Sequence, residues 1–130
     1  QEIGRFVNVP IEEYHQRLTA AASDPSHLSI VVSYGGRGTV IPDIVKILKN
    51  NRSPILLITS TDAIPFAGAA THHLYMSSNE SHYNKISSFS TRLSLLFLLD
   101  CLYTSYFKLD YDHNVAMKMD YYKKISRITW

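Results

Sequence analysis

Residues 33–39 combine hydroxyl groups, glycines and a guanidinium, directly after a short apolar run. Three of the chain's five glycines fall within this segment. Glycine tolerates positive φ and lets the backbone approach a ligand closely, and the N–H groups of a turn that opens a helix bind anions. The segment therefore predicts a site for a phosphate-type anion, with a tight turn that binds nothing as the alternative. The candidate residues are Ser33, Tyr34, Gly35, Gly36, Arg37, Gly38 and Thr39.

A second polar segment, Thr59 to Asp62, follows the apolar run Ile55–Ile58. Ligands of open parallel sheets bind where the carboxyl ends of the strands meet. We therefore expect Thr59 and Ser60 to lie beside the glycine-rich segment and to complete the anion site. Asp62 would repel a phosphate, so it is predicted to cap the short helix that follows.

Glu80 lies in a polar loop, Ser77–Ser81, after the last expected strand. At the same edge of the sheet, its carboxylate could act as a general base on a sugar carbon or bind a sugar hydroxyl. A solvated surface glutamate is the alternative.

The other reactive side chains do not form a recognisable centre. His72 and His73 are neighbours on a strand and point to opposite faces, and no spacing matches a zinc site. Cys101 and Asp100 lie in an apolar run, where we expect a small buried thiol and a buried, hydrogen-bonded acid. The glycines match neither the phosphate-binding P-loop nor the dinucleotide fingerprint. The sequence predicts no metal and no cofactor.

Alternating strands and helices position these segments. Short apolar runs predict strands, and apolar residues at helical spacing predict helices. The order predicts a three-layer α/β/α sandwich with a parallel sheet, Rossmann-like in architecture. The expected strands are Phe6–Val9, Leu28–Val32 (buried on both faces), Ile55–Ile58 and Leu74–Met76. The expected helices are Ile11–Ala22, a second helix that ends at Asn50 and Asn51, a short piece Ile64–Ala70, Tyr83–Phe107 and Asp112–Arg127. The second helix carries Ile41, Ile44, Val45 and Leu48 on one face.

Length and charge set further limits. A chain of 130 residues is expected to form one domain. Its 13 basic and 11 acidic residues are interspersed and give a net charge of +2, which indicates neither a nucleic-acid surface nor a membrane patch. A single cysteine suits a reducing, cytoplasmic location, and we expect no signal peptide. The apolar window Leu93–Tyr103 is too short for a membrane span and is apolar nearly all round, which predicts a dimer or higher oligomer.

Three stretches together resemble the SIS (sugar isomerase) domain, in particular the C-terminal effector domain of RpiR-type bacterial transcriptional regulators. The likeness covers the whole chain. The stretches are Ile30-Val31-Val32-Ser33-Tyr34-Gly35-Gly36, which resembles I-S-Y-S-G-x-T; Ile58-Thr59-Ser60 with Ile64-Pro65-Phe66-Ala67, which resembles I-T-x and S-P-L-A; and Ser90-Thr91-Arg92 through Leu99-Asp100-Cys101-Leu102-Tyr103, which resembles a helix with R and L-x-D-x-L-Y.

The resemblance implies a phosphorylated sugar or amino sugar as effector, a homodimer or homotetramer, and no membrane. It also implies contact with DNA only through an N-terminal helix-turn-helix domain that this sequence lacks. Some residues depart from the pattern. Gly35 stands where a second serine is usual and Gly38 where threonine is usual, which removes two hydroxyl donors and weakens or retunes phosphate binding. Thr71 stands where aspartate is common.

SIS domains also begin with a strand, a glycine-serine turn and a helix that are missing before Gln1. The chain therefore resembles an SIS-like fold without its first βα unit. That strand would lie in the middle of the sheet, where unpaired backbone groups are costly. We expect upstream residues or a swapped segment to fill the slot, rather than Phe6–Val9 pairing with Leu28–Ser33.

Three functions remain open from the sequence. The first is a non-catalytic sugar-phosphate sensor that controls DNA binding. The second is an aldose–ketose phosphosugar isomerase with Glu80 as base. The third is a dimerisation module that has lost its ligand. The resemblance favours the first.

Overall fold

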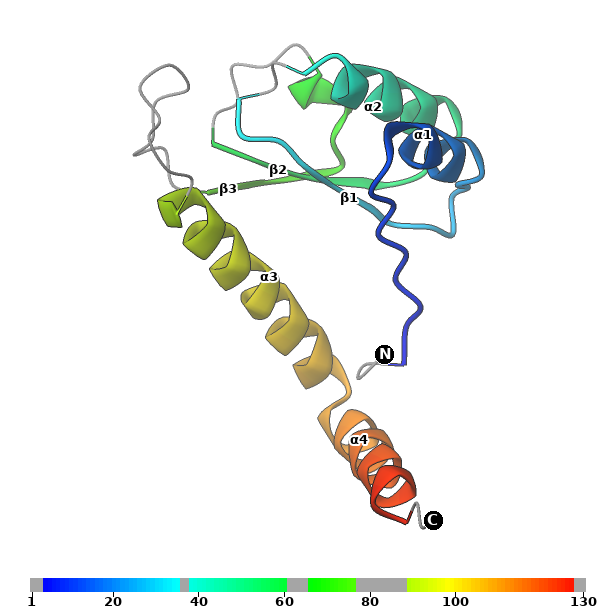
Figure 1. Ribbon diagram of the computed structural model, residues 1–130, viewed down its shortest axis with the longest axis vertical. Coiled ribbons are helices and arrows are strands. Elements are labelled where there is room, and N and C mark those ends of the chain that lie inside the picture. Colours follow the sequence, from blue (N-terminus) through cyan, green and yellow to red (C-terminus); the bar gives the residue numbers. More distant parts are fainter. Residues whose placement is uncertain (1–3, 36–37, 61–65, 77–88, 128–130) are drawn as a thin grey trace. The chain divides into compact units, whose positions relative to one another are not determined.

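The computed structural model describes residues 4–35, 38–60, 66–76 and 89–127. The chain divides into two compact units, Pro10–Leu95, and Gln1–Val9 with Leu96–Trp130, and each is described by itself. The helices and strands along the chain are α1 (Glu13–Ala21), β1 (Ser29–Val32), α2 (Val40–Asn50), β2 (Ile55–Thr59), the 3₁₀ turn η1 (Ala67–Ala69), β3 (His72–Tyr75), α3 (Phe89–Leu109) and α4 (Tyr111–Ser126) (Figure 1).

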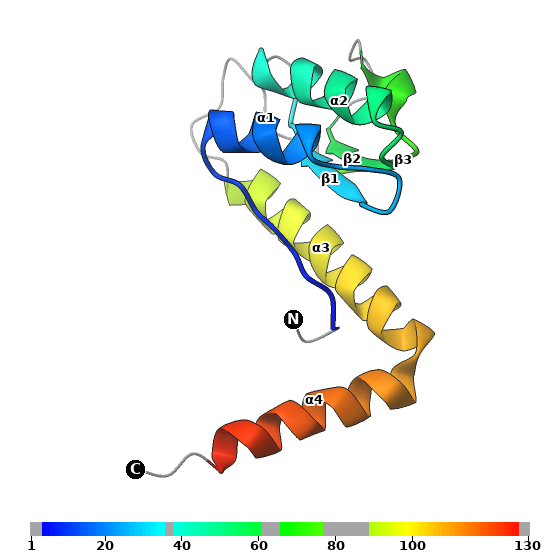
Figure 2. The same ribbon diagram turned by 90° about the vertical axis from the view of Figure 1, so that its right-hand side faces the viewer.

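The unit Pro10–Leu95 is built on a parallel sheet in the order β1-β2-β3. Val31 pairs with Leu57, and Leu57 pairs with His73. Helices α1 and α2 lie together on one face of this sheet (Figure 2). The expected α/β fold with a parallel sheet is confirmed, because both strand pairings are parallel. Parallel neighbours need a long crossover connection, which α2 provides between β1 and β2.

Helix α2 packs on the sheet through the apolar face that was predicted from the helical spacing. Ile44, Val45 and Leu48 are buried, and Asn51 follows the last helical residue, as expected. Pro42 lies in the first turn, where its missing N–H group costs no helical hydrogen bond. Ile44, Val45 and Leu48 share one core with Ala20 of α1, Val31 of β1, Ile55 and Leu57 of β2, and Phe66.

Strand β2 is buried along its whole length, as expected for the central strand of a parallel sheet. The expectation of a strand buried on both faces is wrong for β1. Only Val31 is buried, whereas Ile30 is 48% exposed and Val32 is also exposed. The reason is position: within the described residues, β1 pairs with β2 alone and lies at an edge of the sheet.

The expected strand Phe6–Val9 is also wrong. The segment has no strand geometry, and its apolar side chains are exposed, Phe6 by 91%. An isolated extended segment has no ladder of hydrogen bonds to hold it as a strand. Within the described residues, the sheet consists of β1, β2 and β3. What fills the open edge of β1 stays a prediction.

Asp100 and Cys101 were expected to be buried, and both are exposed on α3. An apolar run predicts burial only if another element covers every side of it. On α3, apolar side chains such as Leu96 and Phe97 are also exposed, so this run offers more apolar surface than the described chain covers.

The second unit contains the end of α3 and all of α4. Buried Asn114 donates a hydrogen bond from Nδ2 to the carbonyl of Phe107 at 2.9 Å, which joins the two helices across their turn. Arg5 donates from Nε to the hydroxyl of Tyr106 at 2.5 Å. The helices of the described residues include none with the length and apolar character needed to cross a membrane.

Candidate functional site

Strands β1 and β2 end side by side, and hydrogen bonds tie together the segments that follow them. The N–H group of Ser33 donates to the carbonyl of Ile58 at 3.0 Å. The N–H group of Ser60 donates to the carbonyl of Tyr34, also at 3.0 Å, and the hydroxyl of Ser60 donates to the same oxygen at 2.6 Å. The structure therefore brings Ser33, Tyr34 and Ser60 together at the carboxyl edge of the sheet.

This geometry defines what Ser60 can offer a ligand. A phosphate accepts hydrogen bonds, and both the N–H and the O–H of Ser60 already donate to Tyr34. Ser60 thus holds the segment after β2 against the segment after β1. Its oxygen keeps the capacity to accept a hydrogen bond, for example from a sugar hydroxyl.

Thr59 lies on a face of the sheet. It is fully buried, and its hydroxyl oxygen lies 2.6 Å from Nε2 of His73 on β3. The His73 ring in turn stacks on Tyr75, with the ring centroids 4.3 Å apart. These contacts link the carboxyl ends of β2 and β3 through side chains.

The residues before α2 present the open part of the edge. Thr39 directly precedes the helix, is exposed, and makes no side-chain capping hydrogen bond. Gly38 is exposed too, and no heavy atom lies within 4 Å of the place that a β-carbon would take. Backbone N–H groups at a helix start carry partial positive charge and favour anions.

A nearby carboxylate is already paired. Asp43, in the first turn of α2, accepts a hydrogen bond from Arg17 of α1 at 2.8 Å. Arg17 also binds Glu13 at 3.0 Å. The hydrogen bond to Asp43, followed by that to Glu13, raises the pKa of the Arg17 guanidinium above its usual value. The ion pair reduces the repulsion that Asp43 would exert on an anion at this end of the helix.

Four residues of the sequence hypothesis lie outside the described residues: Gly36, Arg37, Asp62 and Glu80. Their roles stay predictions. Gly35 is described and half-buried. Within the described part of the chain, no group of three or more His, Cys, Asp or Glu residues could hold a metal ion.

Two features of the edge were missed by sequence reasoning. The carbonyl of Tyr34 joins the two segments, but backbone acceptors leave no signal in a sequence. His73 was set aside as a failed metal ligand, and its bond to Thr59 depends on strand register. The alternation along β3 offered the one usable signal, because it places His73 and Tyr75 on the same face.

The chain matches one protein family and is similar in structure to solved proteins. A family model described as SIS domain matches residues 1–105. The structure of "The Vibrio vulnificus NanR protein complexed with ManNAc-6P" is similar over 98% of this chain and 48% of that one, with a TM-score of 0.83 and 16% sequence identity. A "Crystal structure of an hypothetical protein" is similar over 79% of this chain and 66% of that one, with a TM-score of 0.60 and 13% identity. The chain thus spans about half the length of the NanR chain. No curated protein sequence matches it.

Proposed function

Because the chain belongs to the SIS domain family, we propose that it binds a phosphorylated sugar or amino sugar at the carboxyl edge of its sheet. The observation that carries this proposal is the double hydrogen bond from Ser60 to the carbonyl of Tyr34. It fixes the segments after β1 and β2 against each other, and so builds one site from two loops. The complex of the similar NanR protein with ManNAc-6P supports the ligand class.

The direct phosphate contacts are assigned to the segment before α2. Thr39 supplies an exposed hydroxyl beside the helix N-terminus, Ser33 supplies a second hydroxyl, and Gly35 and Gly38 supply backbone N–H groups. Ser60 accepts from a sugar hydroxyl, and Thr59 fixes the strand ends through His73. Gly36, Arg37 and Glu80 are included in the proposed site on the basis of the sequence alone.

The proposed role is that of a non-catalytic effector domain of an RpiR-type transcriptional regulator. The resemblance in sequence supports it, and DNA binding would belong to a separate helix-turn-helix domain. General-base catalysis needs a positioned proton acceptor, and no described residue pairs an acid with a base at this edge. Incubation with aldose and ketose phosphates should give no conversion. Conversion that disappears in Glu80→Gln would overturn this part of the proposal.

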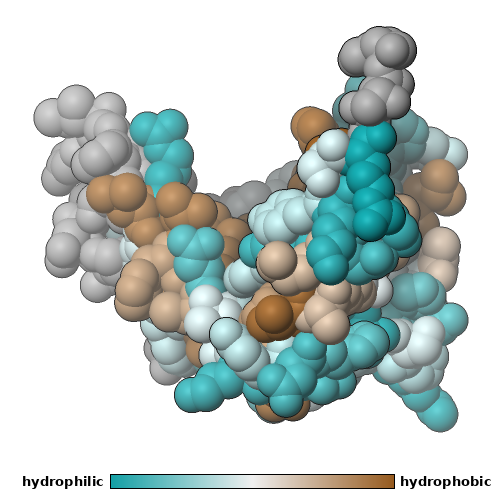
Figure 3. Space-filling model, turned by 90° about the horizontal axis from the view of Figure 1, so that it is seen from below, coloured by the Kyte–Doolittle hydropathy of each residue, from teal (hydrophilic) through white to brown (hydrophobic). Residues whose placement is uncertain are grey.

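Self-association is the second part of the proposed role. Leu93, Leu96, Phe97 and Leu99 are all exposed along α3, and Figure 3 shows apolar side chains at the molecular surface. A soluble monomer rarely exposes so many large apolar side chains on one helix. We therefore propose a homodimer, or a homotetramer, formed through α3.

A thermal-shift panel of sugar phosphates tests the ligand proposal. A ligand that binds only the folded chain raises the melting temperature by mass action. The panel pairs each sugar phosphate with its unphosphorylated sugar. We expect ManNAc-6P or a related compound to raise the melting temperature, and its unphosphorylated partner to leave it unchanged. No shift with any phosphosugar would favour a dimerisation module that has lost its ligand.

A further inference from the structure

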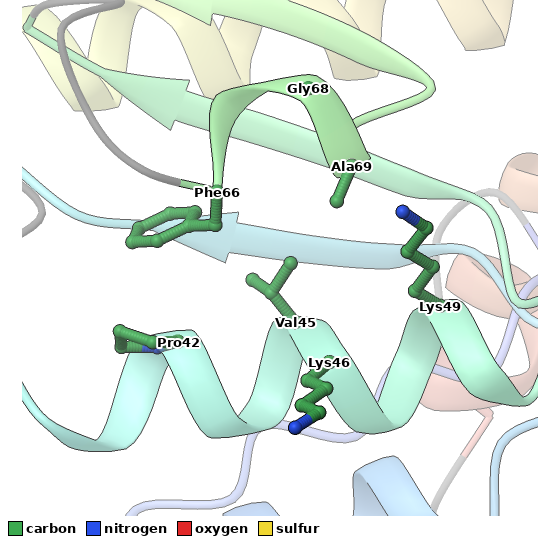
Figure 4. A pocket seen from close by; sticks show the side chains of 7 residues that line it. All are labelled: Pro42, Val45, Lys46, Lys49, Phe66, Gly68 and Ala69. Atoms are coloured by element: carbon green, nitrogen blue, oxygen red, sulfur yellow. The ribbon is translucent and has the colours of Figure 1, made fainter.

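A pocket lies between α2 and η1. Its volume is about 390 Å³, at the small end of the range of ligand pockets. One wall comes from α2 and the other from η1 and the residue before it (Figure 4). The lining residues are Pro42, Val45, Lys46, Lys49, Phe66, Gly68 and Ala69.

The floor of this pocket is apolar and fixed. Val45 and Phe66 are both buried and belong to the hydrophobic core of the unit. Figure 4 shows Val45 directed from α2 toward the η1 side, with Ala69 opposite. Core side chains hold defined positions, so these residues offer a preformed surface for an apolar group.

One end of the pocket is cationic. The Lys49 side chain extends from α2 toward Ala69 (Figure 4), and no acidic residue lines the pocket. Among the described residues, no carboxylate pairs with Lys49 or with Lys46. The ammonium group of Lys49 is therefore available to an anionic partner.

The two ends of the pocket define a ligand length. Pro42 and Lys49 are separated by 49 − 42 = 7 residues of α2, which is about 10 Å along a helix. We propose that this pocket binds a small amphipathic carboxylate, with a ring or branched chain over Val45 and Phe66 and its carboxylate beside Lys49. None of the lining residues belongs to the proposed sugar-phosphate site, so the pocket would accept a second, chemically different effector.

The test uses 3-phenylpropionate, whose length fits, and its uncharged amide, 3-phenylpropanamide. Each is titrated into the full chain while backbone amide signals are followed by NMR. The carboxylate should shift the signals of α2 and η1 saturably, and the amide should bind about two- to fivefold more weakly, as expected for one exposed ion pair. Equal binding of both compounds, or shifts confined to residues 33–39, would overturn the proposal.

Two variants test the location. Ala69 lines the pocket, and Figure 4 shows its side chain directed toward α2. Ala69→Leu should therefore occupy part of the pocket and weaken 3-phenylpropionate at least about tenfold. Lys49→Gln should weaken it about two- to fivefold. Lys123→Gln on α4 removes the same charge in the other unit and should change nothing.

Full affinity in Ala69→Leu would contradict the proposed location, and equal losses in Lys49→Gln and Lys123→Gln would contradict a specific ion pair. Melting temperatures of all variants report whether they fold. ManNAc-6P should not compete with 3-phenylpropionate. The absence of sugar-phosphate binding would leave this proposal intact, so the two proposals fail separately.

Discussion

On neighbouring strands of the sheet, the hydroxyl oxygen of Thr59 lies 2.6 Å from Nε2 of His73. Thr59 is fully buried, so this bond satisfies a polar group inside the fold. It couples the carboxyl end of β2 to β3, at the edge where the sugar phosphate is proposed to bind. The bond therefore gives buried Thr59 a supporting role in the proposed site, through its contact with His73.

Removing this contact should destabilise the fold. We expect His73→Ala to lower the free energy of unfolding by about 1 kcal/mol, the net worth of one buried hydrogen bond, measured by urea denaturation. His72→Ala is the matched control, because His72 is exposed on the same strand. It should stay within about 0.5 kcal/mol of the parent chain. An equal loss in both variants would contradict the assigned role of His73.

Restoring the usual threonine at position 38 should strengthen phosphosugar binding. There is room for a β-carbon at Gly38, and a hydroxyl there could donate to the phosphate. A hydrogen bond to a charged group is worth about 1.5–3 kcal/mol, so we expect Gly38→Thr to lower the dissociation constant at least about tenfold by calorimetry. Gly38→Ala adds the β-carbon without the hydroxyl. If alanine strengthens binding as much as threonine, the hydroxyl is not the cause.

A charge on α3 should disrupt the proposed dimer. Phe97 is 68% exposed, and an aromatic residue at the centre of an interface commonly contributes about 2 kcal/mol or more. We expect Phe97→Glu to raise the dimer dissociation constant at least about thirtyfold, measured by sedimentation. Lys108→Glu also introduces a carboxylate on α3 and should have a much smaller effect. A parent chain that is monomeric at micromolar concentration would refute the dimer.

The free energy of unfolding should also depend on pH through Asp24. The hydroxyl of Ser26, at 2.5 Å, and its N–H group, at 2.8 Å, donate to the Asp24 carboxylate and hold its pKa below the usual value. A lowered pKa means that the stabilising effect is complete above the unfolded-state pKa of about 3.9 and is lost as the pH falls through the folded-state pKa. Asp24→Asn should flatten this part of the curve of unfolding free energy against pH. An unchanged acid limb would count against the contact.

Local patterns in the sequence predicted most of the unit Pro10–Leu95. The spacing of Ile44, Val45 and Leu48 defined the packed face of α2, and the run Ile55–Ile58 predicted the central strand. Burial that depends on distant partners could not be predicted. Among the described residues, Ile30 lies on an edge strand and Phe6 lies outside any strand, yet both look like core residues from the local sequence. The predicted burial of Asp100 and Cys101 on α3 was wrong for the same reason.

The candidate site was predicted in outline. Two hydroxyl-bearing segments after parallel strands were expected to meet, and Ser60 and Tyr34 show that they do. The sequence could not show that the carbonyl of Tyr34 accepts hydrogen bonds from both the N–H and the O–H of Ser60. Nor could it show that the strand register places the Thr59 hydroxyl beside His73. Such contacts depend on backbone geometry and register, which leave no pattern in residue types.

Titration of ManNAc-6P into the chain, with the backbone amide shifts mapped by NMR, tests the proposed phosphosugar site, and ManNAc serves as the matched ligand without phosphate. We expect saturable shifts at residues 33–39 and at Ser60 with ManNAc-6P, and little response to ManNAc. Equal responses to both ligands, or shifts with ManNAc-6P only in other parts of the chain, would contradict a phosphosugar site at the carboxyl edge of the sheet.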